Sequence, residues 1–216
     1  MKQLIEKIEQ LVKAKFNEDA TGHDWHHIRR VTDMALYIQG KEGGNKELVH
    51  LSALLHDISD HKFNGGKLHI NGSVASKIIL ENSGDEELAK RVGEIVDQIS
   101  FKGALVADST TCLEAKIVQD ADRLDAIGAI GIARAFAFGG NRNRPIYEPE
   151  LSPKAHASFE EYANSKSHTV NHFYEKLLLL KDRLHTVTAR EIGEQRHHFM
   201  TSFLDQFYAE WEIKGN

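Results

Sequence analysis

Apolar residues recur at α-helical spacing along almost the whole chain, and this pattern most constrains what its 216 residues can fold into. The three prolines all lie within residues 145–153, so none interrupts the periodicity elsewhere. A hydrophobic fraction of 41% is enough for a sizeable core in a chain of this length. The sequence therefore predicts an all-α protein.

Caps, glycines and breaks in periodicity set the expected helix limits. We expect helices over residues 2–16, 24–39, 45–57, 71–82, 85–99, 111–120, 122–138, 167–185 and 188–212. Residues 139–153 lack periodicity, and loops of this length are commonly lids or binding segments. Because no repeat or flexible linker marks a boundary, the sequence predicts a single domain over residues 1–216.

Composition excludes several classes of protein. The formal net charge of -5 gives no general basic field, so we do not expect nucleic acid as a partner. Cys112 is the only cysteine and cannot form an internal disulfide, and residues 2–16 lack the apolar run of a signal peptide. No stretch approaches the roughly 20 apolar residues that span a bilayer. We expect a cytoplasmic protein without a membrane partner.

His56 and Asp57 give the strongest functional signal, because two ligand-type residues are adjacent at the end of an apolar helix. Consecutive residues on an ideal helix point about 100° apart. Both side chains can meet one ion only where the helix ends or where the ion also contacts another element. A metal at this position therefore needs further ligands from elsewhere in the chain.

His27 and Asp122 are the candidates for those further ligands. His27 precedes Val31 by four residues, which places it on the apolar face of its helix. Asp122 follows Val118 by four residues and is also on an inward stripe. An unpaired carboxylate there is costly, and a cation relieves that cost.

Two imidazoles and two carboxylates form a mixed nitrogen and oxygen site. The sequence predicts one divalent metal ion, with Mn, Ni, Co, Fe, Zn and Mg as candidates. Such an ion can lower the pKa of bound water from about 15.7 to about 7 and can polarise a phosphoryl oxygen. These properties favour hydrolytic chemistry by a metal-activated water.

The order His27, His56, Asp57 and Asp122 resembles the signature of the HD superfamily of metal-dependent phosphohydrolases, and the match covers about residues 20–140. Residues 57–63, 98–103 and 119–128 are similar to the bacterial YedJ/YpgQ-like branch. The resemblance implies an HD-domain helical bundle with a C-terminal helical extension over about residues 154–212. It also implies metal-dependent hydrolysis, with pyrophosphohydrolysis of nucleoside triphosphates as a candidate activity.

The number of metals depends on positions beyond this quartet. HD proteins with two metals usually add further histidines, and His69 fits one such place. Asp97 occupies the next place, where the resemblance leads us to expect a histidine. We therefore favour one metal, and a weaker second ion between His69 and Asp57 stays open.

The remaining candidates are charged residues near the quartet or in loops. We predict Asp60 and Lys62 as catalytic, the first for proton transfer and the second for neutralising phosphate charge. The predicted substrate-binding residues are His23, Lys62, Lys102, Arg123, Arg142 and Arg144. For each of these residues a solvated or structural role is the alternative, and Arg123 can equally pair with Asp120 or Asp125.

The leading hypothesis is a phosphohydrolase acting on a small nucleotide, possibly a nucleoside triphosphate pyrophosphohydrolase. Nucleoside monophosphate phosphatase and cyclic-nucleotide phosphodiesterase are alternatives within this class. An iron oxygenase and a nucleotide-binding regulator without turnover are alternatives on the same scaffold. The expected partner is a small phosphorylated molecule, and a homodimer is left open.

Overall fold

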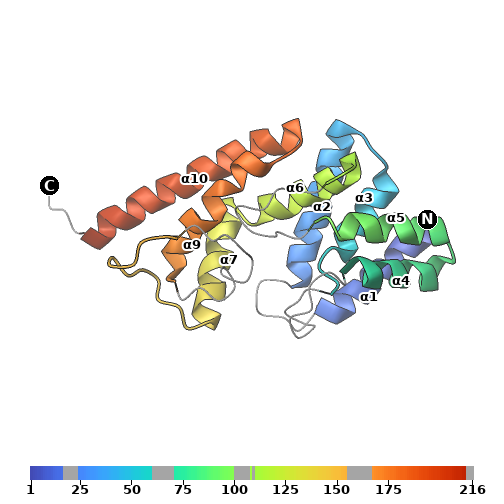
Figure 1. Cartoon of the computed structure of the whole chain (residues 1–216), viewed down its shortest axis with the longest axis horizontal. Helices are drawn as coiled ribbons and strands as arrows, with labels where there is room; N and C mark the ends of the chain where they lie inside the picture. Colours follow the sequence, from blue (N-terminus) through green and yellow to red (C-terminus); the bar gives the residue numbers. More distant parts are fainter. Residues whose placement is uncertain (17–23, 60–70, 100–107, 109, 155–166, 213–216) are drawn as a thin grey trace. The chain divides into compact units, whose positions relative to one another are not determined.

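The computed structural model describes residues 1–16, 24–59, 71–99, 108, 110–154 and 167–212 (Figure 1). Within these ranges the backbone forms helices, short 3₁₀ turns and loops, with no strand. The predicted all-α class is confirmed. None of the described helices is both long and apolar enough to cross a membrane.

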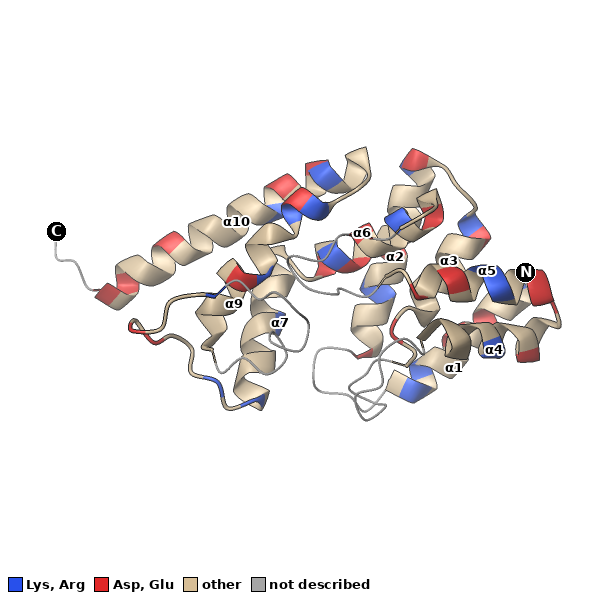
Figure 2. Cartoon of the chain, in the orientation of Figure 1, with Lys and Arg blue, Asp and Glu red and all other residues tan. Residues whose placement is uncertain are grey.

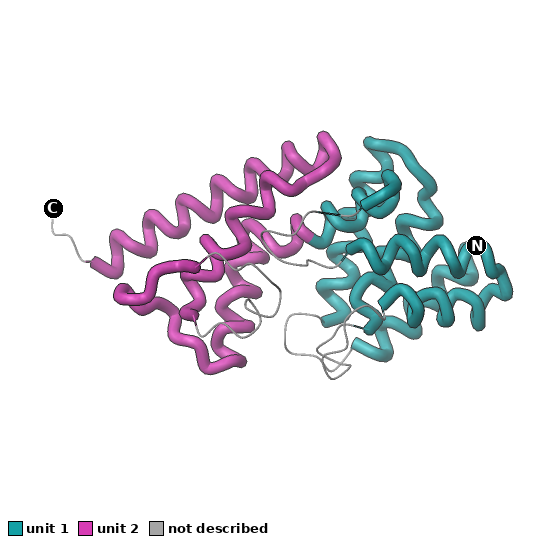
Figure 3. The backbone as a smooth tube through the Cα atoms, viewed as in Figure 1, with its two compact units in different colours: residues 1–102, 106–122 teal, residues 103–105, 123–216 magenta. Residues whose placement is uncertain are grey.

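The chain divides into two compact units, coloured separately in Figure 3. Unit 1 comprises residues 1–102 and 106–122, and unit 2 comprises residues 103–105 and 123–216. The boundary falls inside helix α6 (Leu113–Asp125). A single domain over residues 1–216 stays a prediction, because a compact unit is not by itself an independently folding domain.

Unit 1 is built around α3 (Lys46–Leu55). This helix packs against three others, namely α1 (Lys2–Phe16), α2 (Trp25–Glu42) and α5 (Glu86–Val96). Seven of its ten residues are buried, including the continuous run from position 51 to position 55. Burial on several sides fixes the end of α3, which leads directly into His56 and Asp57.

Side-chain caps define where three helices of unit 1 begin. Asp24 accepts a hydrogen bond from the His27 amide at the start of α2, and Asn45 accepts from the Glu47 and Leu48 amides at the start of α3. These two predicted starts are confirmed. At the start of α5, Asp85 accepts from the Leu88 amide. Such caps satisfy amides that have no partner within the helix.

Helices α4 (Asn71–Ser83) and α5 pack with unusually close backbones. A Cβ added to Gly72 would lie 2.4 Å from the Gly93 carbonyl oxygen, and one added to Gly93 would lie 2.7 Å from the Gly72 carbonyl oxygen. The Gly72 amide donates to Asp97 Oδ1 over 2.8 Å. Asp97 stands where the resemblance leads us to expect a histidine, and its side chain instead holds the first turn of α4.

Unit 2 contains α7 (Gly128–Asn141), α9 (Thr169–Glu175) and α10 (Val187–Glu212). Helix α7 packs against both α9 and α10. Between these helices, the ring centroids of Phe136, Phe173 and Phe203 lie 6.0 Å apart in each pair. Phe136, Phe173 and Phe203 thus form an aromatic cluster that joins the three helices.

Two predicted helix limits in the second half of the chain are wrong. The helix expected to end at residue 120 continues to Asp125, and the break comes at Gly128, whose φ of 75° favours glycine. The helix expected over residues 167–185 ends at Glu175 and is followed by the 3₁₀ turns Leu177–Leu179 and Lys181–Arg183. Leu177 and Leu180 are both buried, and their spacing of three matches the three residues per turn of a 3₁₀ helix.

Candidate metal centre

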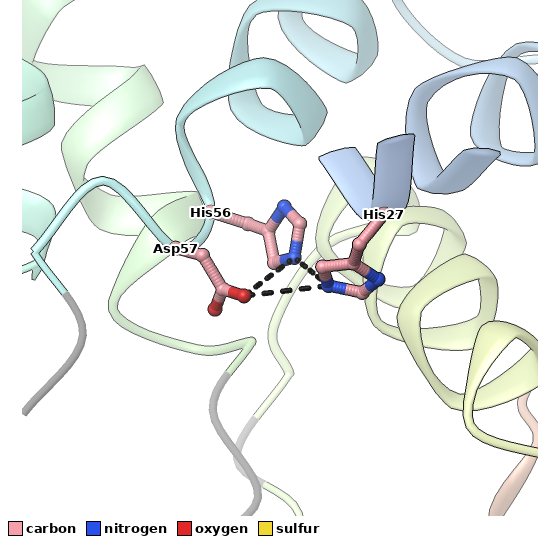
Figure 4. A group of neighbouring side chains, drawn as sticks. All are labelled: His27, His56 and Asp57. Carbon is pink, nitrogen blue, oxygen red and sulfur yellow. Dashed lines mark hydrogen bonds and ion pairs between the residues drawn. The ribbon is translucent and has the colours of Figure 1, made fainter. Parts of the chain in front are cut away.

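Three donor atoms of unit 1 converge on one point (Figure 4). The Nε2 atoms of His27 and His56 lie 3.3 Å apart. Asp57 Oδ2 lies 3.3 Å from His27 Nε2 and 3.5 Å from His56 Nε2. The three donor atoms therefore form a nearly equilateral triangle. Both imidazoles are buried.

Asp122 brings a fourth donor from α6. Its Oδ1 lies 3.6 Å from His27 Nε2 and 3.8 Å from His56 Nε2. The Asp122 side chain is 31% exposed, whereas the His27 side chain is fully buried. The structure thus brings together all four residues predicted to bind the metal, with the solvent-accessible side at Asp122.

The spacing of these donors fits a divalent cation. Metal bonds of about 2.0–2.2 Å, at angles between octahedral and tetrahedral, separate neighbouring donors by about 2.8–3.6 Å. The three distances among His27, His56 and Asp57 fall inside this range, and those to Asp122 fall at or just beyond its upper end. Two imidazoles and two carboxylates also suit borderline divalent metals by donor type.

The tautomer of His56 is set by a backbone contact. His56 Nδ1 lies 2.8 Å from the Ala53 carbonyl oxygen, which can only accept a hydrogen bond. A neutral ring therefore carries its proton on Nδ1, and the lone pair on Nε2 faces the other donors. Contacts of this kind fix the orientation of metal-binding histidines in proteins.

Helix ends place the ligands. His27 lies in the first turn of α2, where its amide donates to Asp24 Oδ1 over 2.8 Å. Helix α3 ends at Leu55, so His56 and Asp57 leave the helix as it terminates. Two adjacent residues can both bind one ion where a helix ends, and His56 and Asp57 have this position.

Lys15 contributes a contact that the sequence did not predict. At the end of α1, Lys15 Nζ donates to the carbonyl oxygen of Ile58 over 2.5 Å. Burial lowers the pKa of the Lys15 ammonium from its ordinary value. No sequence signal pointed to this contact, because it joins residues 43 positions apart.

The other predicted site residues have different surroundings. His23, Asp60, Lys62 and Lys102 lie outside the described residues. Arg123 is buried in unit 2, where Nη1 donates to the Arg183 carbonyl oxygen and lies 3.4 Å from His185 Nε2. These contacts give Arg123 a structural role, and its substrate role stays a prediction. Arg142 and Arg144 follow α7 in unit 2.

Asp125 pairs with Arg134 of α7. Its Oδ2 lies 2.6 Å from Arg134 Nη1, and the Asp125 side chain is almost fully buried. The geometry is that of a short, charge-assisted hydrogen bond between α6 and α7. Asp125 therefore braces the start of unit 2.

Comparisons with known proteins agree with this geometry. The HD domain family model matches residues 24–127. YpgQ of Bacillus subtilis (strain 168) is 40% identical over 218 residues, which cover 100% of this chain and 97% of the relative.

Two solved structures are similar over nearly the full length. An HD-superfamily hydrolase from Bacillus thuringiensis has 39% identity and a TM-score of 0.76, with 99% of each chain covered. Bacillus subtilis YpgQ in complex with ADP has 36% identity and a TM-score of 0.73, with 98% of each chain covered. The chain therefore belongs to the HD superfamily of metal-dependent phosphohydrolases, in the YpgQ-like branch.

Proposed function

We propose that this protein hydrolyses a phosphoanhydride or phosphoester bond in a small nucleotide, with nucleoside triphosphate pyrophosphohydrolysis as the favoured reaction. The observation that carries the proposal is the convergence of two imidazoles and two carboxylates on one point. The complex of the related YpgQ with ADP supports a nucleotide as the substrate class.

The four proposed ligands bind the same ion and differ in their surroundings. His27, His56, Asp57 and Asp122 hold one divalent cation, which when bound supplies a Lewis acid and lowers the pKa of water. The Ala53 carbonyl keeps the His56 lone pair directed at the site. The two carboxylates balance the charge of the cation. Asp122 is the more exposed of the two, so we place the approach of substrate on its side.

Proton transfer and charge neutralisation are assigned to further residues. Asp60 assists the transfer of a proton, and Lys62 neutralises phosphate oxygens. Local cations are needed because the chain has a net charge of -5. Figure 2 shows Lys and Arg positions interspersed with Asp and Glu along the described helices. The proposed substrate-binding set is His23, Lys62, Lys102, Arg123, Arg142 and Arg144.

A single metal is the favoured stoichiometry. Asp97 stands where the resemblance leads us to expect a histidine, and its Oδ1 accepts the Gly72 amide. That hydrogen bond gives Asp97 a structural task at the start of α4. It supports the proposal that the chain lacks a full second ligand set.

A nucleotide panel tests the proposal and separates its alternatives. We expect Mn-loaded protein to release pyrophosphate from a nucleoside triphosphate, when phosphate and pyrophosphate are assayed separately. Asp57→Asn should abolish release, whereas Asp33→Asn, at an exposed carboxylate of α2, should leave it unchanged. Phosphate from monophosphates or opening of cyclic nucleotides would identify the other phosphohydrolase reactions.

Two outcomes would overturn the hydrolase proposal. Tight nucleotide binding without release of either product, with each candidate metal, would identify a regulator. Two irons per chain with oxygen-dependent turnover would identify an oxygenase. Metal content and calorimetry on the same preparations distinguish these outcomes.

A further inference from the structure

Helix α7 ends in a turn with a fixed geometry. The Arg144 amide donates to the Gly139 carbonyl oxygen over 2.9 Å, and the Asn143 amide donates to the Gly140 carbonyl oxygen over 3.1 Å. Asn143 has a φ of 52°. These two hydrogen bonds around a left-handed residue form a Schellman motif. Arg142 and Arg144 therefore extend from defined positions on either side of Asn143.

Both arginines lie over the same aromatic ring. The Cζ atoms of Arg142 and Arg144 are 5.3 Å and 5.9 Å from the centroid of Phe138. A guanidinium over an aromatic ring is held there by cation–π attraction, and the N–H groups directed away from the ring can match the oxygens of a phosphate. Arg142 is exposed, and Arg144 is half-buried.

Helix α9 is fastened to this turn. The Thr169 amide and hydroxyl both donate to the Pro145 carbonyl oxygen, over 2.9 Å and 3.2 Å. The packing is close, because a Cβ added to Gly139 would lie 2.2 Å from Thr169 Oγ1. The start of α9 therefore has a fixed position relative to the end of α7.

His172 of α9 lies within electrostatic reach of Arg144. Burial, together with the positive charges of Lys176 and Arg144, lowers the pKa of His172 to about 3. Both cations thus act on one ring, which is neutral at pH 7. The carbonyl dipoles at the end of α7 favour positive charge at Arg142 and Arg144.

We propose that Arg142 and Arg144 form an anion site within unit 2 that takes a phosphate group. The two guanidinium edges bind the phosphate oxygens, and Phe138 holds the arginines in position. The choice of phosphate as the anion rests on the proposed function, whereas anion binding itself does not require hydrolysis.

Calorimetric titration of the full-length, chelator-treated protein with inorganic pyrophosphate at low ionic strength tests the site. We expect Arg142→Gln/Arg144→Gln to weaken binding at least about tenfold. The control Arg29→Gln/Lys90→Gln also removes two positive charges, each paired with an acid on an exposed helix face of unit 1. It should change the affinity less than about threefold.

The parent failing to bind pyrophosphate at up to about 10 mM would overturn the site. Equal weakening in the control would do the same, since it would show a response to net charge alone. Arg142→Lys/Arg144→Lys keeps the charge and should still bind more weakly than the parent. Full affinity there would overturn the role of the guanidinium edges. The titration uses metal-free protein, so its result does not depend on whether the nucleotide panel shows hydrolysis.

Discussion

At the residue scale, the proposed metal centre depends on hydrogen bonds that place its donors before any ion binds. Asp24 fixes the amide of His27, and the Ala53 carbonyl fixes the ring of His56. Neither partner is itself a proposed ligand. Preorganisation of this kind lowers the cost of gathering four donors around a cation.

Replacing Asp24 tests that preorganisation. Asp24→Ala should cost about 1 kcal/mol of stability, as lost caps do, and should also weaken Mn binding by about tenfold. Asp85→Ala is the matched control, because Asp85 caps α5 through the same position three residues later. It should lose similar stability in urea unfolding while keeping its Mn affinity in calorimetry. Equal Mn affinities in the two variants would contradict a positioning role for Asp24.

His172 makes the stability of unit 2 depend on pH. Its pKa is about 3 in the fold and 6.5 in an unfolded chain, so the unfolded state binds more protons between these values. The contribution of neutral His172 to the free energy of unfolding is therefore largest above pH 6.5 and falls as the pH drops toward 3. Between pH 7 and pH 5 we expect His172 to account for a loss of about 1 to 2 kcal/mol, discounted because the residue is half-buried.

Urea unfolding at both pH values, monitored in unit 2, measures this loss. In His172→Gln the difference between pH 7 and pH 5 should shrink by that amount. A variant with the same pH dependence as the parent would show that other groups are responsible.

At the element scale, the close approach of α4 and α5 depends on glycine. In Gly72→Ala, the new methyl group would lie 2.4 Å from both the Asp97 side chain and the Gly93 carbonyl oxygen. We expect a loss of at least about 2 kcal/mol, because a backbone atom cannot move aside cheaply. In the control Gly40→Ala, nothing lies within 4 Å of the new Cβ, and this change inside α2 should stabilise by up to about 1 kcal/mol. Chemical denaturation measures both, and unchanged stability in Gly72→Ala would rule out the close packing.

Helix starts could be predicted from the sequence where a side chain sets them. Asp24 and Asn45 carry their own capping signals, and both helices begin as expected. The limit at Glu175 has no comparable local signal. It depends on tertiary packing, such as the burial of Leu177 and Leu180, which overrides helical propensity. Beyond Asp125 the local signal is Gly128, which the predicted helix limits did not use.

The convergence of the four proposed ligands could be inferred because each lies at an inward register or at a helix end. Lys15 could not be found in this way, since its partner carbonyl is 43 residues away. Asp97 shows the same limit, because only the structure reveals its hydrogen bond with Gly72. Sequence periodicity gives the direction of a side chain, and the contact itself depends on tertiary structure.

At the scale of the whole molecule, metal binding should be linked to folding. A cation that binds only the folded state stabilises it by about 2.7 kcal/mol at a hundredfold excess over its Kd. We expect chelator treatment to lower the melting temperature, and Mn to restore it. Asp122→Asn should reduce the gain, whereas Asp33→Asn should keep it. A melting temperature that neither chelator nor Mn changes would argue against a metal site in the folded state.

The most direct test of the central claim is a crystal structure of the Mn-loaded protein with anomalous scattering data. We expect one anomalous peak per chain, about 2.0–2.3 Å from His27 Nε2, His56 Nε2, Asp57 Oδ2 and Asp122 Oδ1. A well-ordered site without a peak between these four side chains, from crystals saturated with Mn, would contradict the proposed metal centre.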